Sequence, residues 1–396
     1  METVSTSKNY KLNIYKFYIF NIILGIHTVR GVYIPFMMEW GGLTFFQIMM
    51  LQSYFTFMIF IFEIPSGAIA DRIGRNYALM LSGVFVTLAA LTYSIIPNIL
   101  LFFLAETFWA FSLALSSGTD EAFLFNTLKT MDKEKELPKI ISRNQSLNLI
   151  ALTLSAPLGS IIAEFISLQF TMFCLAIIYS GATLVSLTFK EPKIGITHQS
   201  QKYLAIIKEG FHELRRNKIL RVLCFDRVFI GVLTYFLFWT YQVYLGQVNI
   251  PLIWFGFITA FMNIVNMVFT LLIPWFLKSF KKKLVFLIII DLIIGCAYIL
   301  LGFTINPILG VLLILTIVAF GYPRYLVYVN GINRQIKSEN RATVLSTINM
   351  FRSFLAAIIY PFIGIFVEWN LFAVFILTGI LILIFTVLTR VKNEYL

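Results

Sequence analysis

Long apolar runs alternate with short polar segments along almost the whole chain. A transmembrane helix needs roughly 20 mostly apolar residues, and most of the runs reach that length. They are continuous, whereas the strands of a transmembrane β-barrel alternate between apolar and polar positions. The pattern therefore predicts an all-α membrane protein with twelve spanning helices, at about 12–36, 44–70, 77–97, 99–126, 140–164, 168–189, 219–246, 251–278, 284–303, 307–328, 342–366 and 371–390.

A polar segment, 190–218, interrupts this pattern near the middle of the chain. Inside it, apolar residues recur at helical spacing between lysines and arginines, at Leu204, Ile207, Phe211 and Leu214. Such spacing is typical of an amphipathic helix that lies on the inner membrane surface; a solvated linker is the alternative. We therefore expect two bundles of six helices, 1–189 and 219–396, joined by this segment.

The two predicted bundles share a weak internal repeat. A constant shift along the chain superposes Asn126 on Asn330, Pro157 on Pro361 and Glu164 on Glu368. Secondary transporters are often built from such duplicated units, with the substrate site at the interface between the repeats near the middle of the membrane. The repeat predicts that the two six-helix bundles are pseudo-symmetric.

The chain carries 31 Lys and Arg against 19 Asp and Glu, which gives a net charge of +12. Most basic residues gather at the two ends, in the middle segment, and in or next to alternate loops; those set apart from these regions, within predicted helices, include Arg30, Arg227, Arg324 and Arg352. Because positive residues stay on the cytoplasmic side of a membrane, both termini and the loop 71–76 are expected there. This distribution explains the basic excess without nucleic acid as a partner.

Composition narrows the picture further. The chain is 59% hydrophobic and only 13% charged, whereas soluble proteins carry about 25% charged residues, so little material is left for soluble domains. Its three cysteines form no CxxC pair, and neither a disulfide frame, a metal site nor a cofactor is expected. The first apolar run lacks a small-residue cleavage site and is expected to be a retained helix. No GxxxxGK[ST] loop occurs, so ATP is not the expected energy source.

The stretch "GAIADRIGR", Gly67 to Arg75, resembles the loop 2–3 signature of the major facilitator superfamily, roughly G-x-x-x-D-R-x-G-R-[KR]. The matching residues are Gly67, Asp71, Arg72, Gly74 and Arg75, and Asn76 departs from the pattern. The stretches "EIPS", "SGTDEAFLFNTL" and "ENRATVLSTINM" resemble a prokaryotic, drug-efflux-like branch of that superfamily. The resemblance implies a monomeric transporter in the prokaryotic cell membrane that works by alternating access.

The resemblance also implies a role for the signature loop as a conformational latch between the two bundles. Gly67 would let the second helix approach a neighbour closely, and Gly74 would permit a sharp turn. Asp71 would face the positive N-terminal end of the eleventh helix, while Arg72 and Arg75 would bind carbonyl groups or lipid phosphates. The alternative is an anchor that acts only through its positive charge.

Ionisable residues inside spans are costly, and each is a functional hypothesis. In the superfamily, helices 1, 4, 7 and 10 line the substrate cavity, so Arg30 and Glu106 are expected to pair across it, with His27 one turn away. Glu106 is the preferred proton carrier, and Glu63 and Asp226 are the alternatives. A static Arg30–Glu106 pair that orders two helices also remains open.

Two further interpretations concern the rest of the predicted interior. Glu63 and Arg352 lie at similar depths on helices that face each other in the family fold, so they are expected to bridge the bundles in one state; Asp291 is expected to be structural. The cavity wall is expected to contain aromatic side chains that suit amphipathic or cationic solutes, at Trp109, Tyr235, Trp239 and Tyr322.

These observations predict a secondary transporter and not an enzyme. Its expected partners are a small-molecule substrate, protons and the lipid bilayer. Export of small amphipathic molecules in exchange for protons is the preferred function. Proton-coupled uptake of a metabolite is the alternative, and a non-transporting membrane sensor on the same fold is a third possibility.

Overall fold

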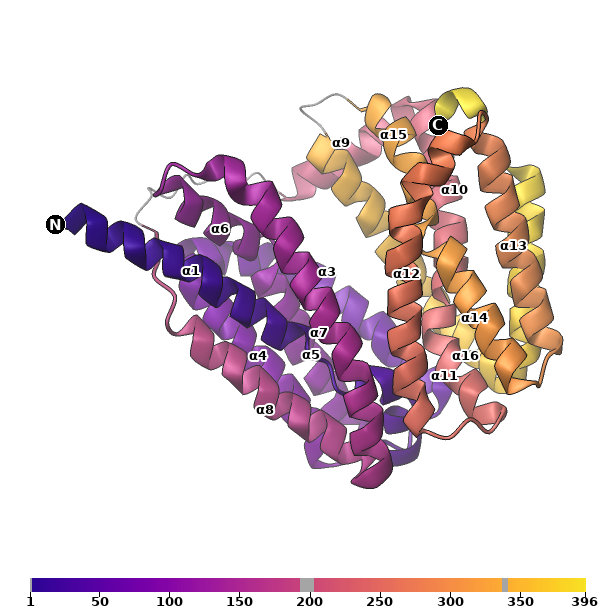
Figure 1. Cartoon of the computed structure of the whole chain (residues 1–396), viewed down its shortest axis with the longest axis horizontal. Helices are drawn as coiled ribbons and strands as arrows, with labels where there is room; N and C mark the ends of the chain where they lie inside the picture. Colours follow the sequence, from indigo (N-terminus) through magenta and orange to yellow (C-terminus); the bar gives the residue numbers. More distant parts are fainter. Residues whose placement is uncertain (1, 193–202, 337–340) are drawn as a thin grey trace. The chain divides into compact units, whose positions relative to one another are not determined.

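The computed structural model describes residues 2–192, 203–336 and 341–396, and every regular element within these ranges is helical. Figure 1 shows the helices in chain order. The α-helices are α1 Glu2–Gly25, α2 Tyr33–Pro35, α3 Phe45–Ile73, α4 Arg75–Ile95, α5 Ile99–Ser116, α6 Thr119–Lys129, α7 Leu137–Phe165, α8 Leu168–Ser186, α9 Tyr203–Arg216, α10 Lys218–Tyr235, α11 Leu237–Gln247, α12 Ile253–Ser279, α13 Lys283–Phe303, α14 Pro307–Gly321, α15 Leu326–Arg334 and α16 Arg341–Leu388.

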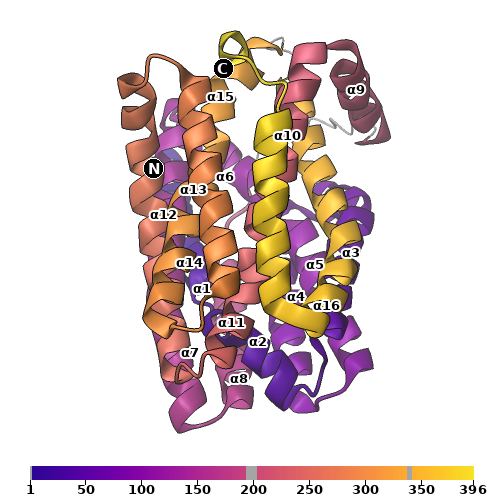
Figure 2. The same ribbon diagram turned by 90° about the vertical axis from the view of Figure 1, so that its right-hand side faces the viewer.

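Eleven segments of the described chain are long and apolar enough to cross a membrane. The last of them, Thr343–Leu388, has 46 residues, which is more than twice the length that one crossing needs. Its backbone leaves the helical conformation at Asn370 (φ −166°, ψ 105°), and the Asn370 side chain accepts a hydrogen bond from the amide of Ala373 at 3.0 Å. The two helices predicted at 342–366 and 371–390 are therefore the two arms of α16, which bends between them (Figure 2).

The contacts divide the chain into two compact units. Unit 1 comprises Met1–Leu43, Tyr54–Ser200 and Leu252–Ala260, and unit 2 comprises Thr44–Ser53, Gln201–Pro251 and Phe261–Leu396. The helices α3 and α12 thus contribute residues to both units. In unit 1, the Ser160 hydroxyl donates to the carbonyl of Ile253 at 2.7 Å; in unit 2, the amide of Phe46 donates to the Glu368 carboxylate at 2.6 Å.

Small residues set the packing inside each unit, as they do in other membrane proteins. In unit 1, α4 packs along α5 and α8, and a Cβ on Gly83 would lie 2.9 Å from the Thr183 hydroxyl. In unit 2, α13 packs along α14 and α16, and a Cβ on Gly379 would lie 2.5 Å from the carbonyl of Gly295. These close approaches leave no space for larger residues.

The helix predicted within segment 190–218 corresponds to α9, which belongs to unit 2. Residues 193–202 and the side chains of Leu204 and Ile207 lie outside the described part of the chain. The helix packs against α10 and α16, and a Cβ on Gly210 would lie 1.9 Å from the Thr347 hydroxyl. One face of α9 is therefore covered by protein, which the charge and apolar pattern alone did not indicate.

Candidate functional site

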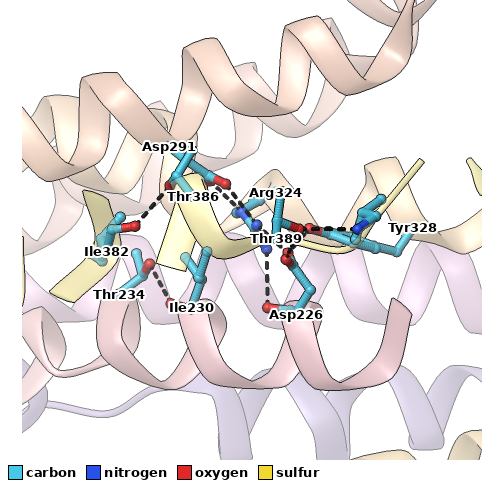
Figure 3. Close-up of polar contacts among 10 residues, drawn as sticks. Asp226, Ile230, Thr234, Asp291, Arg324, Tyr328, Ile382, Thr386 and Thr389 are labelled. Atoms are coloured by element: carbon cyan, nitrogen blue, oxygen red, sulfur yellow. Dashed lines mark hydrogen bonds and ion pairs between the residues drawn. The ribbon is translucent and has the colours of Figure 1, made fainter. Parts of the chain in front are cut away.

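Unit 2 encloses two carboxylates and one guanidinium in direct contact (Figure 3). The Arg324 side chain donates from Nε to Asp291 Oδ1 at 2.5 Å and from Nη2 to Asp291 Oδ2 at 2.8 Å. The same Nη2 donates to Asp226 Oδ1 at 2.7 Å. Arg324 is 2% exposed, Asp291 2% and Asp226 6%. Charges buried this deeply are stable only when they are paired, and this set is called the Arg324 centre below.

Two hydroxyl groups also donate hydrogen bonds to Asp226. The Tyr328 hydroxyl, on α15, donates to Oδ1, and the Thr389 hydroxyl donates to Oδ2 at 2.5 Å. The Arg324 guanidinium also lies over the Tyr328 ring, 5.0 Å from its centroid. Asp226 therefore accepts hydrogen bonds from three side chains that belong to different segments.

The local sequence explains why these groups meet. Asp226 and Asp291 each lie eight positions after the first residue of their helix, Lys218 and Lys283, which is about 12 Å along the axis at 1.5 Å per residue. Proline ends a helix because it lacks an N–H group; α14 ends at Gly321, and Pro323 begins the 3₁₀ turn η4, Pro323–Tyr325. That turn places Arg324 against both aspartates.

The segment 389–396 folds back over unit 2 and fixes the position of Thr389. The Lys283 ammonium donates to the carbonyl of Leu396 at 2.8 Å, and the amide of Leu284 donates to the Asn393 side chain at 3.3 Å. Leu396 is 1% exposed. A Cβ on Gly331 would lie 2.1 Å from the Tyr395 carbonyl, so α15 also lies directly against the segment.

The charge of the Arg324 centre depends on one proton. With both carboxylates ionised, the centre carries one more negative than positive charge. Arginine does not lose its proton in proteins, so a proton bound at either carboxylate makes the centre neutral. The net charge of the centre would thus change by one on uptake or loss of a single proton.

Unit 1 encloses a different group of polar residues around Glu106 on α5. The Tyr93 hydroxyl donates to Glu106 Oε1 at 2.5 Å, and the Tyr33 hydroxyl donates to the same oxygen at 3.4 Å. Glu106 is 4% exposed. We call this set the Glu106 centre.

The sequence-predicted residues His27 and Trp109 do come together in unit 1. Their rings stack with centroids 5.5 Å apart, and the Tyr179 ring lies 6.4 Å from His27 in an edge arrangement. Arg30 begins the 3₁₀ turn η1, Arg30–Val32, and lies within electrostatic range of His27 and Tyr179. The predicted pairing of Arg30 with Glu106 remains a prediction.

A break in the first span positions His27 and Arg30. The helix α1 ends at Gly25, and Thr28 donates a hydrogen bond from its hydroxyl to the carbonyl of Thr171 at 2.8 Å. A Cβ on Gly159 would lie 1.5 Å from the Thr28 carbonyl. The close approach of α7 is therefore possible only because position 159 has no side chain.

The predicted aromatic residues of unit 2 also form a cluster. The Tyr235 and Tyr322 rings have centroids 6.3 Å apart, and Trp239 meets Tyr360 on α16 edge to face at 5.9 Å. Tyr360 was not predicted, although it lies one position before Pro361 in a helix that the sequence does predict. Each aromatic set lies within its own unit.

The structure describes the backbone conformation and the contacts of the signature loop within unit 1. Gly74 adopts φ +98° and ψ 152°, a region that is nearly exclusive to glycine. A Cβ placed on Gly67 has no described atom within 4 Å, and its role in close packing remains a prediction. Within unit 1, Arg75 donates to the carbonyl of Ala122 at 3.0 Å and the Asn76 amide donates to Glu191 at 2.8 Å. The roles of the loop residues, Gly67, Asp71, Arg72, Gly74 and Arg75, in a latch remain predictions.

Sequence reasoning identified Asp226 as a candidate proton carrier and missed its ion pair. It assigned no role to Arg324 and a structural one to Asp291, and the structure places both against Asp226. The similar depth of the three charges, eight positions inside the span for each aspartate and ten positions before the end of the span for Arg324, is the signal that would have joined them. The bridge between Glu63 and Arg352, which belong to different units, remains a prediction.

Comparisons with known proteins agree with this architecture. Solved structures of similar fold include the nucleoside transporter NupG (TM-score 0.77, 14% identity, covering 96% of this chain and 98% of that one). They also include a D-xylose–proton symporter (TM-score 0.70, 14% identity, covering 98% of this chain and 99% of that one). A third is a bacterial homolog of the human lysosomal transporter Spinster (TM-score 0.70, 14% identity, covering 97% of this chain and 94% of that one). No curated protein is significantly similar in sequence.

The family assignment rests on the sequence match itself. The family model described as Major Facilitator Superfamily matches residues 17–361, which is most of the chain. Together with the transporter structures of similar fold, this match indicates a multi-pass membrane transporter and not an enzyme. The chain belongs to the Major Facilitator Superfamily.

Proposed function

We propose that this protein is a proton-coupled secondary transporter that exports small amphipathic molecules by alternating access. It acts as a monomer in the prokaryotic cell membrane, with twelve crossings, two six-helix bundles joined by segment 190–218, and both termini in the cytoplasm. The observation that carries the coupling is the Arg324 centre, in which Asp226 and Asp291 share one guanidinium inside a spanning unit.

The excess carboxylate is the main argument for proton coupling. A centre that served only to join helices would be stable with one carboxylate for each arginine, because every additional buried charge costs several kcal/mol. A second carboxylate is tolerable when it takes up a proton. Loading and release of that proton would change the net charge of the centre by one, and such a change can favour one transporter conformation over another.

Glu106 is the second candidate for the proton site, and the signature loop is the proposed latch. The Tyr93 and Tyr33 hydroxyls donate hydrogen bonds to Glu106. If the Glu106 carboxyl group is protonated, either hydroxyl oxygen can instead accept a hydrogen bond from it. Glu63 is a third candidate, with its proposed bridge to Arg352. His27, Arg30 and Trp109 in unit 1 and Tyr235, Trp239 and Tyr322 in unit 2 would line the substrate path.

The proposal is tested by separating substrate exchange from proton-driven accumulation. A thermal-shift screen of the purified protein selects a solute, because a ligand of the native state raises apparent stability. In proteoliposomes, Asp226→Asn and Asp291→Asn should each abolish accumulation driven by a pH gradient, while exchange of labelled for unlabelled solute continues. Glu164→Gln, an exposed carboxylate of α7, is the matched control.

Each outcome of this experiment has a definite meaning. Accumulation by both aspartate variants at the wild-type level would exclude the Arg324 centre as the coupling site, and Glu106→Gln would then be the next variant. The direction of net flux under inside-acid and outside-acid gradients separates export from uptake. Uptake is the second candidate function, because a sugar–proton symporter is among the solved structures of similar fold.

A further inference from the structure

One carboxylate oxygen of the Arg324 centre differs from the others (Figure 3). Both oxygens of Asp291 and the Oδ1 atom of Asp226 accept hydrogen bonds from the Arg324 guanidinium. In the described part of the chain, Oδ2 of Asp226 accepts one hydrogen bond, from the Thr389 hydroxyl at 2.5 Å. A guanidinium keeps its protons and has no acceptor, so it cannot pass a proton on. Oδ2 is therefore the oxygen that faces a group able to exchange one.

Thr389 lies between this oxygen and the surface of unit 2. Asp226 is 6% exposed, whereas Thr389 is partly exposed and the adjacent Arg390 is exposed. Because a charged side chain in hydrocarbon is costly, the exposed Arg390 indicates that this end of α16 is near water. A single hydroxyl group thus separates Oδ2 from the surface.

The hydrogen bonds of Thr389 leave one position on its oxygen open. A hydroxyl group has one donor hydrogen and two acceptor lone pairs. Thr389 donates its hydrogen to Asp226, and one lone pair accepts the hydrogen bond from the Val391 amide at 3.3 Å. No other group of the described chain binds Oγ1, so its second lone pair is available to a water molecule.

The segment 389–396 keeps the hydroxyl in this position. Val391 is 4% exposed and Leu396 1%, so the segment is packed into unit 2 on both sides of its exposed residues. The hydrogen bond from the Leu284 amide to Asn393 fixes it between these two points. Proton transfer requires a donor and an acceptor within hydrogen-bond reach, and the segment maintains that reach.

The charged and titratable groups around Asp226 come from several elements. Arg324 of η4 and Tyr328 of α15 both donate to Oδ1, and Asp291 of α13 shares the guanidinium. None of these groups contacts Oδ2 in the described chain. The further charged or titratable side chains that act on these residues or on their neighbours are Arg227 of α10, Tyr325 of η4 and Arg352 of α16.

From this geometry we infer that Thr389 is the relay through which a proton enters and leaves the Arg324 centre, with Oδ2 of Asp226 as the entry atom. On entry, a hydronium ion gives a proton to the open lone pair of Oγ1, and the hydrogen that Thr389 donates passes to Oδ2. One O–H bond forms and one breaks at Thr389, the hydronium ion becomes water, and the centre becomes neutral. Release follows the reverse path. The inference rests on the proposed proton coupling and adds the residue that controls its rate.

The rate of proton uptake tests the inference without a substrate or a gradient. The purified full chain in detergent is acidified rapidly, and infrared spectroscopy follows the carbonyl stretch of protonated carboxyl groups. The signal of the centre is the part of this band that Asp226→Asn removes. In Thr389→Val that signal should appear about a hundredfold more slowly, the lower end of what a positioned proton-transfer group contributes. Its final amplitude should equal or exceed that of the wild type, because the ionised carboxylate has lost a donor.

Two further variants separate the relay from a structural role. Thr389→Ser keeps the hydroxyl and should take up the proton at the wild-type rate. Thr386→Val is the matched control, because Thr386 is on the same helix and 6% exposed, and its hydroxyl donates to the carbonyl of Ile382. It should also keep the wild-type rate. If the segment only held helices together, Thr389→Val would loosen it and admit water, and uptake would be as fast as in the wild type or faster.

The outcomes distinguish this inference from the proposed function. Wild-type uptake in Thr389→Val, or uptake in Thr389→Ser as slow as in Thr389→Val, would overturn the relay and leave proton coupling at the centre intact. Absence of any wild-type signal that Asp226→Asn removes would overturn both. Thermal unfolding checks that each variant is folded. If Thr389→Val does not fold, Thr389→Ala removes the same hydroxyl, and uptake as fast as in Thr389→Ser would overturn the relay.

Discussion

The two units hold their buried carboxylates in different ways. In unit 1, Glu106 receives hydrogen bonds from Tyr93 and Tyr33, two side chains that carry no formal charge. In unit 2, Asp226 and Asp291 are bound by one guanidinium as well as by hydroxyl groups. A hydrogen bond to a charged partner is roughly twice as strong as one between neutral groups. Among the contacts described within each unit, Glu106 is held by neutral hydroxyl donors, whereas the Arg324 centre joins helices through an ion pair.

The largest effect should follow removal of the guanidinium that binds the two buried aspartates of unit 2. Arg324→Gln leaves two buried carboxylates without their guanidinium, and we expect a loss of about 3–5 kcal/mol in the free energy of unfolding. Chemical denaturation in detergent measures it.

The triple variant Asp226→Asn, Asp291→Asn, Arg324→Gln supplies the control. It leaves no unpaired charge, so it should recover most of the lost stability even though transport stays abolished. A loss below about 1 kcal/mol for Arg324→Gln, as found for exposed ion pairs, would mean that the centre is less important to unit 2 than its burial indicates.

Unit 1 has its own costly feature, in the backbone. Gly74, with φ +98° and ψ 152°, occupies a conformation that costs other residues about 1–3 kcal/mol, so Gly74→Ala should destabilise the protein by that amount. Gly67→Ala is the matched variant in the same loop region. It lies inside α3 with no described neighbour within 4 Å, and alanine in a helix interior is favoured over glycine by about 0.5–1 kcal/mol.

Thermal unfolding of the two glycine variants should therefore shift in opposite directions. Destabilisation by both replacements to the same extent would show that the backbone conformation at Gly74 is not the cause of its effect.

The smallest effect compares one hydroxyl group in each centre. Thr389→Val removes a donor to Asp226, and Tyr93→Phe removes a donor to Glu106. We expect about 2 kcal/mol for Thr389→Val, because its acceptor is an ionised carboxylate of an ion pair, and about 1 kcal/mol for Tyr93→Phe if Glu106 is protonated, because that bond then joins two neutral groups. Equilibrium unfolding of both variants provides the ratio. Equal losses would show that Glu106 is ionised like Asp226.

Much of this architecture is readable from the sequence because apolar runs of membrane length have few alternatives. The runs at 342–366 and 371–390 correspond to the arms of α16, separated at Asn370. Asp226 stands out for the same reason, as a charge within an apolar run. Local chemistry of this kind needs no knowledge of the tertiary fold.

Other features depend on contacts between distant segments and were not predictable in this way. Thr389 lies at the end of an apolar run and shows no sign of polar function, yet the return of segment 389–396 places its hydroxyl on a residue 163 positions earlier in the chain. The close approach of Gly210 to Thr347 likewise depends on the tertiary fold. The pairing of Arg324 with Asp291 is an intermediate case, since comparison of depths in successive spans would have identified it.

The segment 389–396 also connects the interior of unit 2 to its surface. Thr389 touches Asp226 inside the unit, while Arg390 and Lys392, one and three positions later, are exposed and are the kind of residue after which trypsin cuts. We expect release of the Thr389 hydrogen bond to loosen the chain at these two residues. The rate of tryptic cleavage there therefore provides a reporter of the state of Asp226, which lies too deep for direct chemical labelling from solvent.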